Sequence, residues 1–257
     1  MLLAVDVGNT QTVIGLFEDG ACRVHRRMAT KPESTSDELR VLLRQLLELD
    51  ALNEADIVGM ALSSVVPELT ATWCRAADGL GCEPLVVSPS KVPFLPITYD
   101  YPNEIGADRL ADAVAAVNRY GAPVIVVDLG TATNIEVIDR DGAFVGGIIA
   151  PGVMASADAL FAAAARLARV DLVAPEKPIG TNTRAAVQSG LVYGEVDRID
   201  GLVRRVIDQL GYTAPVIATG GLAGMVAPLS TTVTAHDENL TLEGLHDIYE
   251  WNREHAD

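Results

Sequence analysis

The fold is decided by the stretch Leu2-Leu3-Ala4-Val5-Asp6-Val7-Gly8-Asn9-Thr10 at the start of the chain. Its apolar run is typical of a buried strand, and the glycine after it predicts a sharp turn. The next residues, Thr12 to Phe17, are again mostly apolar and lead to a second turn signal at Asp19-Gly20. The pattern therefore predicts a β-hairpin, and it lacks the glycine-rich signatures of Rossmann and P-loop nucleotide sites.

The turn of this hairpin carries groups that suit a phosphate ligand. Gly8 allows the backbone to approach a ligand closely. The residues from Asn9 to Thr12 offer backbone and side-chain donors to phosphate oxygens. Asp6 lies at the end of the strand, where a carboxylate can hold a hydrated cation. These features favour a phosphate-binding turn.

The same pattern recurs 122 residues later, at Asp128-Leu129-Gly130-Thr131-Ala132-Thr133. Another apolar run, residues 123–127, precedes it, and the trailing turn signal recurs as well. At this one offset three features correspond: Asp6 with Asp128, Gly8 with Gly130, and Asp19-Gly20 with Asp141-Gly142. Self-similarity at one spacing indicates a duplicated unit. Two unrelated strand-to-turn junctions are the alternative, and the matched trailing turn favours a pair of phosphate-binding hairpins.

Composition limits the possible partners. The 257 residues suffice for one large domain or two of ordinary size. A net charge of −16 argues against nonspecific binding to nucleic acid or to anionic membranes. The three cysteines lack C-x-x-C spacing, which fits a reducing compartment. Neither a signal peptide nor a membrane span is indicated, so we expect a cytoplasmic protein without nucleic acid or membrane partners.

Elements can be assigned along the first half. A third strand is expected over residues 22–28, and a helix begins near Ser36 behind a Thr35/Glu38 capping box. A strand over 56–64, a helix over 68–80 and a short strand over 84–87 follow. This order is typical of a mixed α/β sheet that starts with a meander.

The second half starts at a waist near residues 118–123, so we expect domains of 1–118 and 119–257. After the repeated hairpin, an alanine-rich helix is expected over 154–167 and a long helix over 184–210. Thr181 or Thr183 is either the N-cap of the long helix or a substrate contact. The glycine pair at Gly220-Gly221 either passes beneath a nucleotide or allows tight packing. The last helix, after residue 240, is expected to pack back.

A further candidate site is Gly106-Ala107-Asp108-Arg109, at the start of a helix that runs to about residue 119. It follows a loop rich in proline, tyrosine and aspartate, which indicates function. A carboxylate at a helix start is ordinarily a capping residue. The alternative is a general base that accepts a hydroxyl proton, beside a guanidinium that holds an anionic substrate.

The motifs of the chain follow one another in this order: Asp6-Val7-Gly8-Asn9-Thr10, Ser63-Ser64-Val65-Val66-Pro67, Gly106-Ala107-Asp108-Arg109, Asp128-Leu129-Gly130-Thr131-Ala132-Thr133, Gly146-Gly147 with Pro151-Gly152, Ile179-Gly180-x-Asn182-Thr183 and Thr219-Gly220-Gly221. In their order and spacing the chain resembles the type III pantothenate kinases of the acetate kinase–sugar kinase–Hsp70–actin superfamily. The resemblance covers nearly the whole chain, although Tyr101 before Pro102 and Ala168 after Leu167 depart from the usual family pattern.

The resemblance implies an α/β fold of two duplicated actin-like, ribonuclease H-like half-domains, each with a mixed central sheet and with the active site in the cleft between them. It implies a homodimer that phosphorylates pantothenate with ATP, the first step of coenzyme A biosynthesis. Asp108 would be the general base. Mg²⁺ would accompany the nucleotide near Asp6, and a monovalent cation, potassium or ammonium, would bind Asp128.

The resemblance also assigns ligand contacts to other residues. The ATP loop would comprise Asp6, Val7, Gly8, Asn9, Thr10, Gln11, Thr12 and Val13, with Thr131 as a further ATP contact. The pantothenate pocket would comprise Tyr99, Gly106, Ala107, Asp108, Arg109 and Thr183.

Two alternatives stay open, because fold alone does not define function. One is another small-molecule kinase or a phosphatase of the superfamily, from which the motif at residues 106–109 and Tyr99 would distinguish the chain. The other is a non-catalytic regulatory protein on the same fold. Loss of Asp6, Asp108 or Asp128 would favour the regulatory protein, and all three residues are present.

Overall fold

Each half of the chain forms a five-stranded mixed sheet that starts with a three-stranded meander. The computed structural model describes residues 1–164 and 166–256. The first sheet has the order β3-β2-β1-β4-β5 and contains β1 (Leu2–Val7), β2 (Gln11–Glu18), β3 (Ala21–Ala29), β4 (Gly59–Ser64) and β5 (Pro84–Val86). The second has the order β10-β9-β6-β7-β8 and contains β6 (Val124–Leu129), β7 (Ala132–Ile138), β8 (Phe144–Pro151), β9 (Val216–Thr219) and β10 (Ala235–His236).

The two sheets share one topology. In each, the first strand pairs antiparallel with the second and parallel with the fourth, which pairs parallel with the fifth. The central strands β1 and β6 consist of aliphatic residues apart from one aspartate each, and both show the same burial pattern. This identity of strand order confirms the duplication that the sequence predicts.

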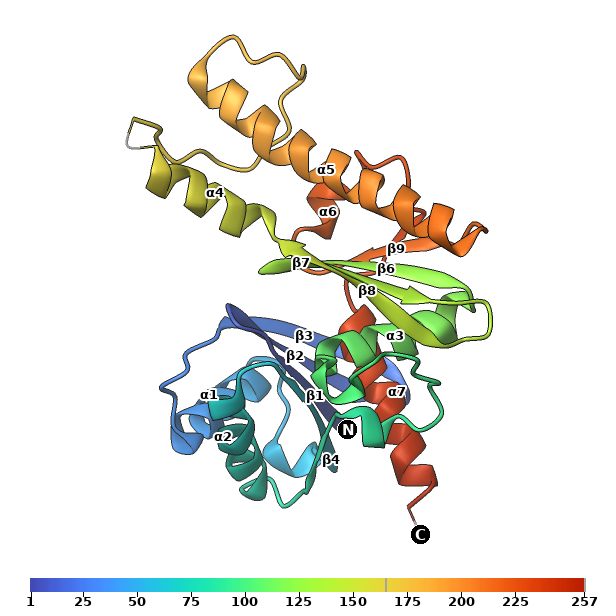
Figure 1. Ribbon diagram of the computed structural model, residues 1–257. Helices are drawn as coiled ribbons and strands as arrows, with labels where there is room; N and C mark the ends of the chain where they lie inside the picture. Colours follow the sequence, from blue (N-terminus) through green and yellow to red (C-terminus); the bar gives the residue numbers. More distant parts are fainter. Residues whose placement is uncertain (165, 257) are drawn as a thin grey trace. The chain divides into compact units, whose positions relative to one another are not determined.

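Helices cover both faces of the first sheet (Figure 1). Helices α1 (Ser36–Leu49) and α2 (Pro67–Asp78) lie together on one face, and α3 (Ala107–Tyr120) and α7 (Leu240–Glu254) lie on the other. The predicted capping box starts α1, because the Thr35 side chain accepts the Glu38 N–H and the Glu38 carboxylate accepts the Thr35 N–H. Buried leucines of α1 and Trp73 of α2 join the aliphatic side chains of the strands in one core.

Helix α7 belongs to the first unit, whose residues are Met1–Ala115 and Asn239–Asp257, whereas the second unit is Ala116–Glu238. The expected domain of 119–257 therefore differs from the structure in its last segment. Leu242, Leu245 and Ile248 of α7 are buried, the Thr241 hydroxyl donates to Asp112 Oδ1 at 2.6 Å, and His246 stacks on Phe17. These contacts hold α7 on the first sheet, so the last helix packs back on the first half of the chain, as predicted.

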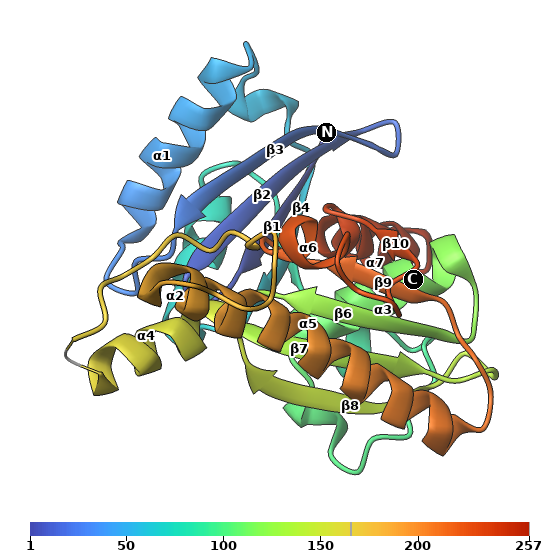
Figure 2. The same cartoon turned by 90° about the horizontal axis from the view of Figure 1, so that it is seen from above.

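The second unit is built around α5 (Thr183–Leu210), which lies across the second sheet (Figure 2). Its residues Val196, Ile199 and Val203 pack on the aliphatic face of β6 and β7. Gly211, in the left-handed region at φ 74°, ends the helix. Helix α4 (Val153–Ala163) packs on α5, and the short α6 (Ala223–Val226) follows β9.

Helix α4 is shorter than the expected 154–167. It ends at Ala163, and Ala165 lies outside the described residues. Because Val153 and Ala157 are the buried residues of α4, little packing is available to hold a further turn.

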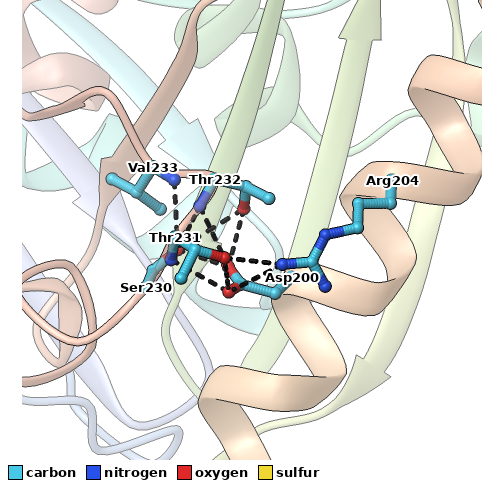
Figure 3. A network of polar contacts seen from close by, with 6 residues as sticks. All are labelled: Asp200, Arg204, Ser230, Thr231, Thr232 and Val233. Atoms are coloured by element: carbon cyan, nitrogen blue, oxygen red, sulfur yellow. Dashed lines mark hydrogen bonds and ion pairs between the residues drawn. The ribbon is translucent and has the colours of Figure 1, made fainter.

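A polar network joins α5 to the loop before β10 (Figure 3). The Asp200 carboxylate, which is 4% exposed, accepts the N–H groups of Thr231 and Thr232 at 2.9 and 3.2 Å. It also accepts the hydroxyls of Ser230, Thr231 and Thr232. Burial alone would raise the pKa of Asp200, but these hydrogen bonds outweigh burial and hold the pKa well below its usual range. Asp200 therefore fixes this loop as an anion.

Candidate functional site

The first candidate loop is the turn between β1 and β2. Val7 pairs with Thr12 in the ladder, and the Gly8 N–H donates to the Gln11 carbonyl at 3.0 Å, which closes the turn. Asn9, Thr10 and Gln11 are exposed, whereas Thr12 is buried. The turn thus presents three consecutive polar residues to solvent, and Val13 lies in the strand behind them.

Thr30 supports this turn through hydrogen bonds to its backbone, a role that the sequence alone did not indicate. Its hydroxyl donates to the Gly8 carbonyl at 2.7 Å, and its N–H donates to the Thr10 carbonyl at 2.9 Å. The Thr12 and Thr30 hydroxyl oxygens are 2.9 Å apart. Since the single hydroxyl proton of Thr30 goes to Gly8, Thr12 donates to Thr30. Only the meander brings Thr30 beside the turn, so no local sequence signal marks it.

Asp6 occupies the position in β1 that the sequence indicates. It pairs with Val13 in β2 and with Ser63 in β4, and its side chain is partly buried. One carboxylate suffices for Mg²⁺, which keeps several waters and takes its other ligands from substrate phosphates. The described residues contain no group of three or more His, Cys, Asp or Glu side chains that could hold a metal ion. The donor set therefore fits a cation that arrives with a nucleotide.

The second candidate site is the start of α3. The Asp108 Oδ1 accepts the Arg109 N–H at 2.8 Å, so the carboxylate satisfies a first-turn donor, as the capping interpretation expects. A Cβ at Gly106 would lie 2.3 Å from this oxygen, and only glycine leaves the carboxylate its place. Arg109 is buried, with 6% exposure, and Ala107 is also buried.

The chemistry of Asp108 fits a proton acceptor as well as a cap. Burial raises the pKa of the Asp108 carboxyl, and the Arg109 N–H and guanidinium offset only part of this rise. A carboxyl group with a raised pKa at the start of a helix is a candidate general base. The capping contact and the role of proton acceptor are compatible, because the Arg109 N–H donates to Oδ1 and a proton can be taken up at the other carboxylate oxygen.

Val65 links this helix start to the first loop. Its N–H donates to the Val7 carbonyl at 3.0 Å, immediately before Gly8. A Cβ at Gly106 would lie 3.7 Å from Val65 Cγ1. The motif Ser63-Ser64-Val65-Val66-Pro67 therefore has a structural role, because it holds the end of β1 next to the start of α3.

The remaining predicted pantothenate contacts are divided between the units. Tyr99 lies in the first unit, partly buried in the loop before α3, and Tyr101 in the same loop is 67% exposed. Thr183 is the exposed first residue of α5 in the second unit. Neither Thr181 nor Thr183 caps α5, because Asn182 is the N-cap and its side chain accepts the Ala185 N–H at 2.9 Å. Of the two interpretations of these threonines, the N-cap is therefore wrong, because asparagine takes that place as an equally good cap, and the substrate contact stays a prediction.

The third candidate site is the turn between β6 and β7, which corresponds to the first turn but is one residue shorter. The Gly130 N–H donates to the Ala132 carbonyl at 3.0 Å, and Thr131 is exposed between them. Gly220, at φ +88°, packs against this region, because a Cβ there would lie 2.3 Å from Asp128 Oδ1. For Gly220 the structure therefore supports the tight-packing interpretation of the glycine pair.

The two sheets with their matched turns define the class of fold. The protein has the duplicated two-domain fold of the actin-like sugar kinases. A conserved candidate Baf family transcriptional activator from Campylobacter jejuni has a similar structure, with TM-score 0.60 and 18% identity over 98% of this chain and 99% of that one. So does a candidate N-acetylmannosamine kinase from Listeria monocytogenes, with TM-score 0.55 and 12% identity over 99% of both chains. At these identities the likeness shows the fold alone.

The family within this class is shown by sequence. The model of the type III pantothenate kinase family matches residues 2–205. A type III pantothenate kinase from Thermomicrobium roseum is 48% identical over 97% of both chains. The chain belongs to the type III pantothenate kinase family.

Proposed function

We propose that this protein phosphorylates pantothenate with ATP, as the first step of coenzyme A biosynthesis. One observation carries the proposal: in a chain of this family, both Asp-x-Gly hairpin turns and the helix start at Gly106–Arg109 are intact. The described helices include none long and apolar enough to cross a membrane. The expected cytoplasmic location stays a prediction.

The two hairpin turns take part in ATP binding. The turn that follows Asp6, with exposed donors from Asn9 to Gln11, and the turn at Gly130-Thr131 offer N–H and hydroxyl groups to phosphate oxygens. Because the protein carries a net charge of −16, such local donors must offset its overall repulsion of ATP. Mg²⁺ at Asp6 would neutralise charge on the phosphates when it is bound with the nucleotide.

Asp108 acts on the acceptor hydroxyl. The hydroxyl oxygen of pantothenate forms a bond to the γ-phosphorus while the bond to the ADP oxygen breaks, and the hydroxyl proton passes to the Asp108 carboxylate. Transition states of this kind are loose, so the base mainly orients the hydroxyl and takes its proton late. Arg109 would hold the pantothenate carboxylate, with Tyr99, Gly106 and Ala107 beside it in the first unit. Thr183 of the second unit stays a predicted pantothenate contact.

A monovalent cation, potassium or ammonium, would bind at Asp128 and supply local positive charge beside the phosphates. The carboxylate fits this role because an oxygen ligand suits a hard cation and because Gly220 leaves it room at the end of β6. Activity should then depend on potassium. Equal rates in potassium and in a large organic cation would contradict the site.

The protein would act as a homodimer that associates through α4. Of the eleven residues of this helix, all but Ser156 and Asp158 are apolar, yet Met154 and Leu160 are 46% and 37% exposed. A helix that is apolar all round is normally buried. A second copy of the chain would cover it.

The proposal is tested with purified protein, ATP and pantothenate, by following the formation of 4'-phosphopantothenate with and without potassium. Product formation supports the proposal. Failure to form product by a protein that still binds ATP would favour a different small-molecule substrate or the regulatory alternative.

A further inference from the structure

Glu195 is a buried carboxylate in the middle of α5 for which the proposed function has no role. It is 3% exposed, and a buried carboxylate is stable only with well-placed partners. The Thr133 hydroxyl donates to Glu195 Oε1 at 2.6 Å, and the Arg198 guanidinium donates to Oε2. Both oxygens are therefore occupied by side chains from defined places in the fold.

Both partners lead to the same turn. Thr133 pairs with Leu129 as the first ladder pair next to the turn at Gly130–Ala132. Arg198 donates a second hydrogen bond to the Pro151 carbonyl at 2.6 Å, and the next N–H, that of Gly152, donates to the Thr131 carbonyl at 3.2 Å. Two separate chains of contacts thus connect one carboxylate to the second candidate phosphate turn, one through Thr133 at its β7 end and the other through Thr131 within it.

The first turn is held in a comparable way. Thr12 pairs with Val7 as Thr133 pairs with Leu129, and the two threonines are 1% and 2% exposed. Thr12 reaches Thr30, which donates to the Gly8 carbonyl. A buried threonine hydroxyl therefore supports each turn. Thr12 bonds to Thr30 in the first unit, and Thr133 bonds to Glu195 in the second.

We propose that Glu195 is a positioning residue for ATP: through Thr133 and Arg198 it fixes the turn at Gly130–Ala132 in the shape that accepts phosphate oxygens. The proposal rests on the proposed function of this turn. Donors that are already fixed bind an anion without the loss of freedom that ordering a loop would cost. Glu195 does not need to touch ATP, since its effect passes through the two partners.

The decisive variants are Thr133→Val, which keeps the shape and removes the hydroxyl, and Thr133→Ser, which restores a hydroxyl. Thr133→Val should raise the KM for ATP about tenfold, the loss expected when a buried charged acceptor loses its donor. The KM for pantothenate should change less than about twofold, and Thr133→Ser should recover ATP binding to within about threefold. Glu195→Gln should give a KM for ATP between those of Thr133→Val and Thr133→Ser, because its amide oxygen still accepts from Thr133 while Arg198 loses its charged partner.

Val203→Ala is the matched control for a purely structural effect. Val203 is fully buried on the same helix, so its truncation lowers the melting temperature without touching the network. The proposal predicts that the KM for ATP of this control stays within about twofold of wild type. The inference is overturned if Thr133→Val leaves the KM for ATP unchanged, or if Val203→Ala raises it equally.

Failure of the proposed function is recognised separately, because the wild-type protein would then form no phosphopantothenate. Calorimetric titration with ATP tests the inference in that case. A tenfold weaker Kd for Thr133→Val supports it. Equal affinities, or no ATP binding by wild type, overturn it.

Discussion

At the scale of single residues, Asp108 is the group whose charge should matter most. Its pKa is raised above the ordinary value of 3.8 by burial, with partial compensation by Arg109. Asp108→Asn should lower kcat by about 10²- to 10⁴-fold, because the amide cannot take a proton. The measurement is steady-state phosphorylation of pantothenate together with calorimetric titration of ATP, whose affinity should be unchanged. Turnover close to wild type would remove Asp108 from the mechanism.

The raised pKa of Asp108 also affects the stability of the fold. Because the folded-state pKa lies above the unfolded one, the charged carboxylate costs free energy in the folded protein at neutral pH, and this cost is lost as pH falls through the raised pKa. Asp108→Asn should therefore unfold in urea at pH 7 with a free energy equal to or above that of wild type. A clear loss of stability would show that Asp108 serves chiefly as a cap of α3.

The glycines of the second turn should respond differently to alanine. Gly130 has room for a Cβ, which would meet the Asp128 carboxylate oxygens at 3.7 and 3.9 Å. Gly130→Ala should leave the free energy of unfolding within about 0.5 kcal/mol of wild type, yet raise the KM for ATP by obstructing its approach. Gly220→Ala should cost about 2 kcal/mol or more, because φ is +88° and the new Cβ would overlap Asp128. Urea unfolding and ATP kinetics on both variants test this contrast. Unaltered ATP kinetics in Gly130→Ala would argue against phosphate binding at this turn.

At the scale of elements, the sequence predicts whatever depends on local pattern. The strand β1, the capping box of α1, the start of α3 and the long helix α5 lie close to their expected positions. The repeat of the hairpin at a fixed offset also predicts two sheets of one design, which the strand orders confirm.

Sequence reasoning missed contacts between distant elements. Thr30 stabilises the first turn and Glu195 the second, and neither role has a local signal, because their partners Thr12 and Thr133 are 18 and 62 residues away. The place of α7 on the first sheet also depends on tertiary contacts, here those of Thr241 and His246. The strand pairing sets a further limit on what the sequence repeat can predict. Thr12 and Thr133 hold equivalent places in the two ladders but are 121 residues apart, so the repeat offset of 122 residues does not match them.

Among the contacts between elements, the Asp200 hydrogen-bond network should have the clearest effect on stability. Asp200→Asn should lower the free energy of unfolding by about 2 kcal/mol at pH 7, because an amide nitrogen would face donors of Thr231 or Thr232. The pKa of Asp200 is lowered on folding, so this contribution is present above the ordinary pKa of 3.8 and is lost as pH falls through the lowered value. Urea unfolding of the two proteins at several pH values tests the prediction.

Asp208→Asn is the matched control for Asp200→Asn. Asp208 is exposed on the same helix, so its substitution should change the free energy of unfolding by less than about 0.5 kcal/mol. Equal effects of the two variants would mean that the loss of charge on α5, and not the network, determines the result.

At the scale of the whole molecule, two properties oppose each other in the proposed dimer. The exposed apolar side chains of α4 favour association, whereas two chains that each carry −16 repel one another. Salt screens the repulsion and leaves the apolar contact intact. Raising the salt concentration from about 0.05 to about 0.5 M should therefore strengthen the dimer, as measured by sedimentation velocity.

Substitution on α4 tests whether this helix is the surface involved. Leu160→Asp places a charge in the apolar face and should yield monomers at all salt concentrations, because burial of an unpaired carboxylate is costly. Leu49→Asp changes a leucine of α1 in the first unit that is 73% exposed, and it adds the same charge on a different helix, so it should leave the dimer intact. A monomeric wild type, or equal dissociation of both variants, would contradict association through α4. Weakening of the wild-type dimer by salt would instead indicate that ion pairs, and not the apolar face, hold the two chains together.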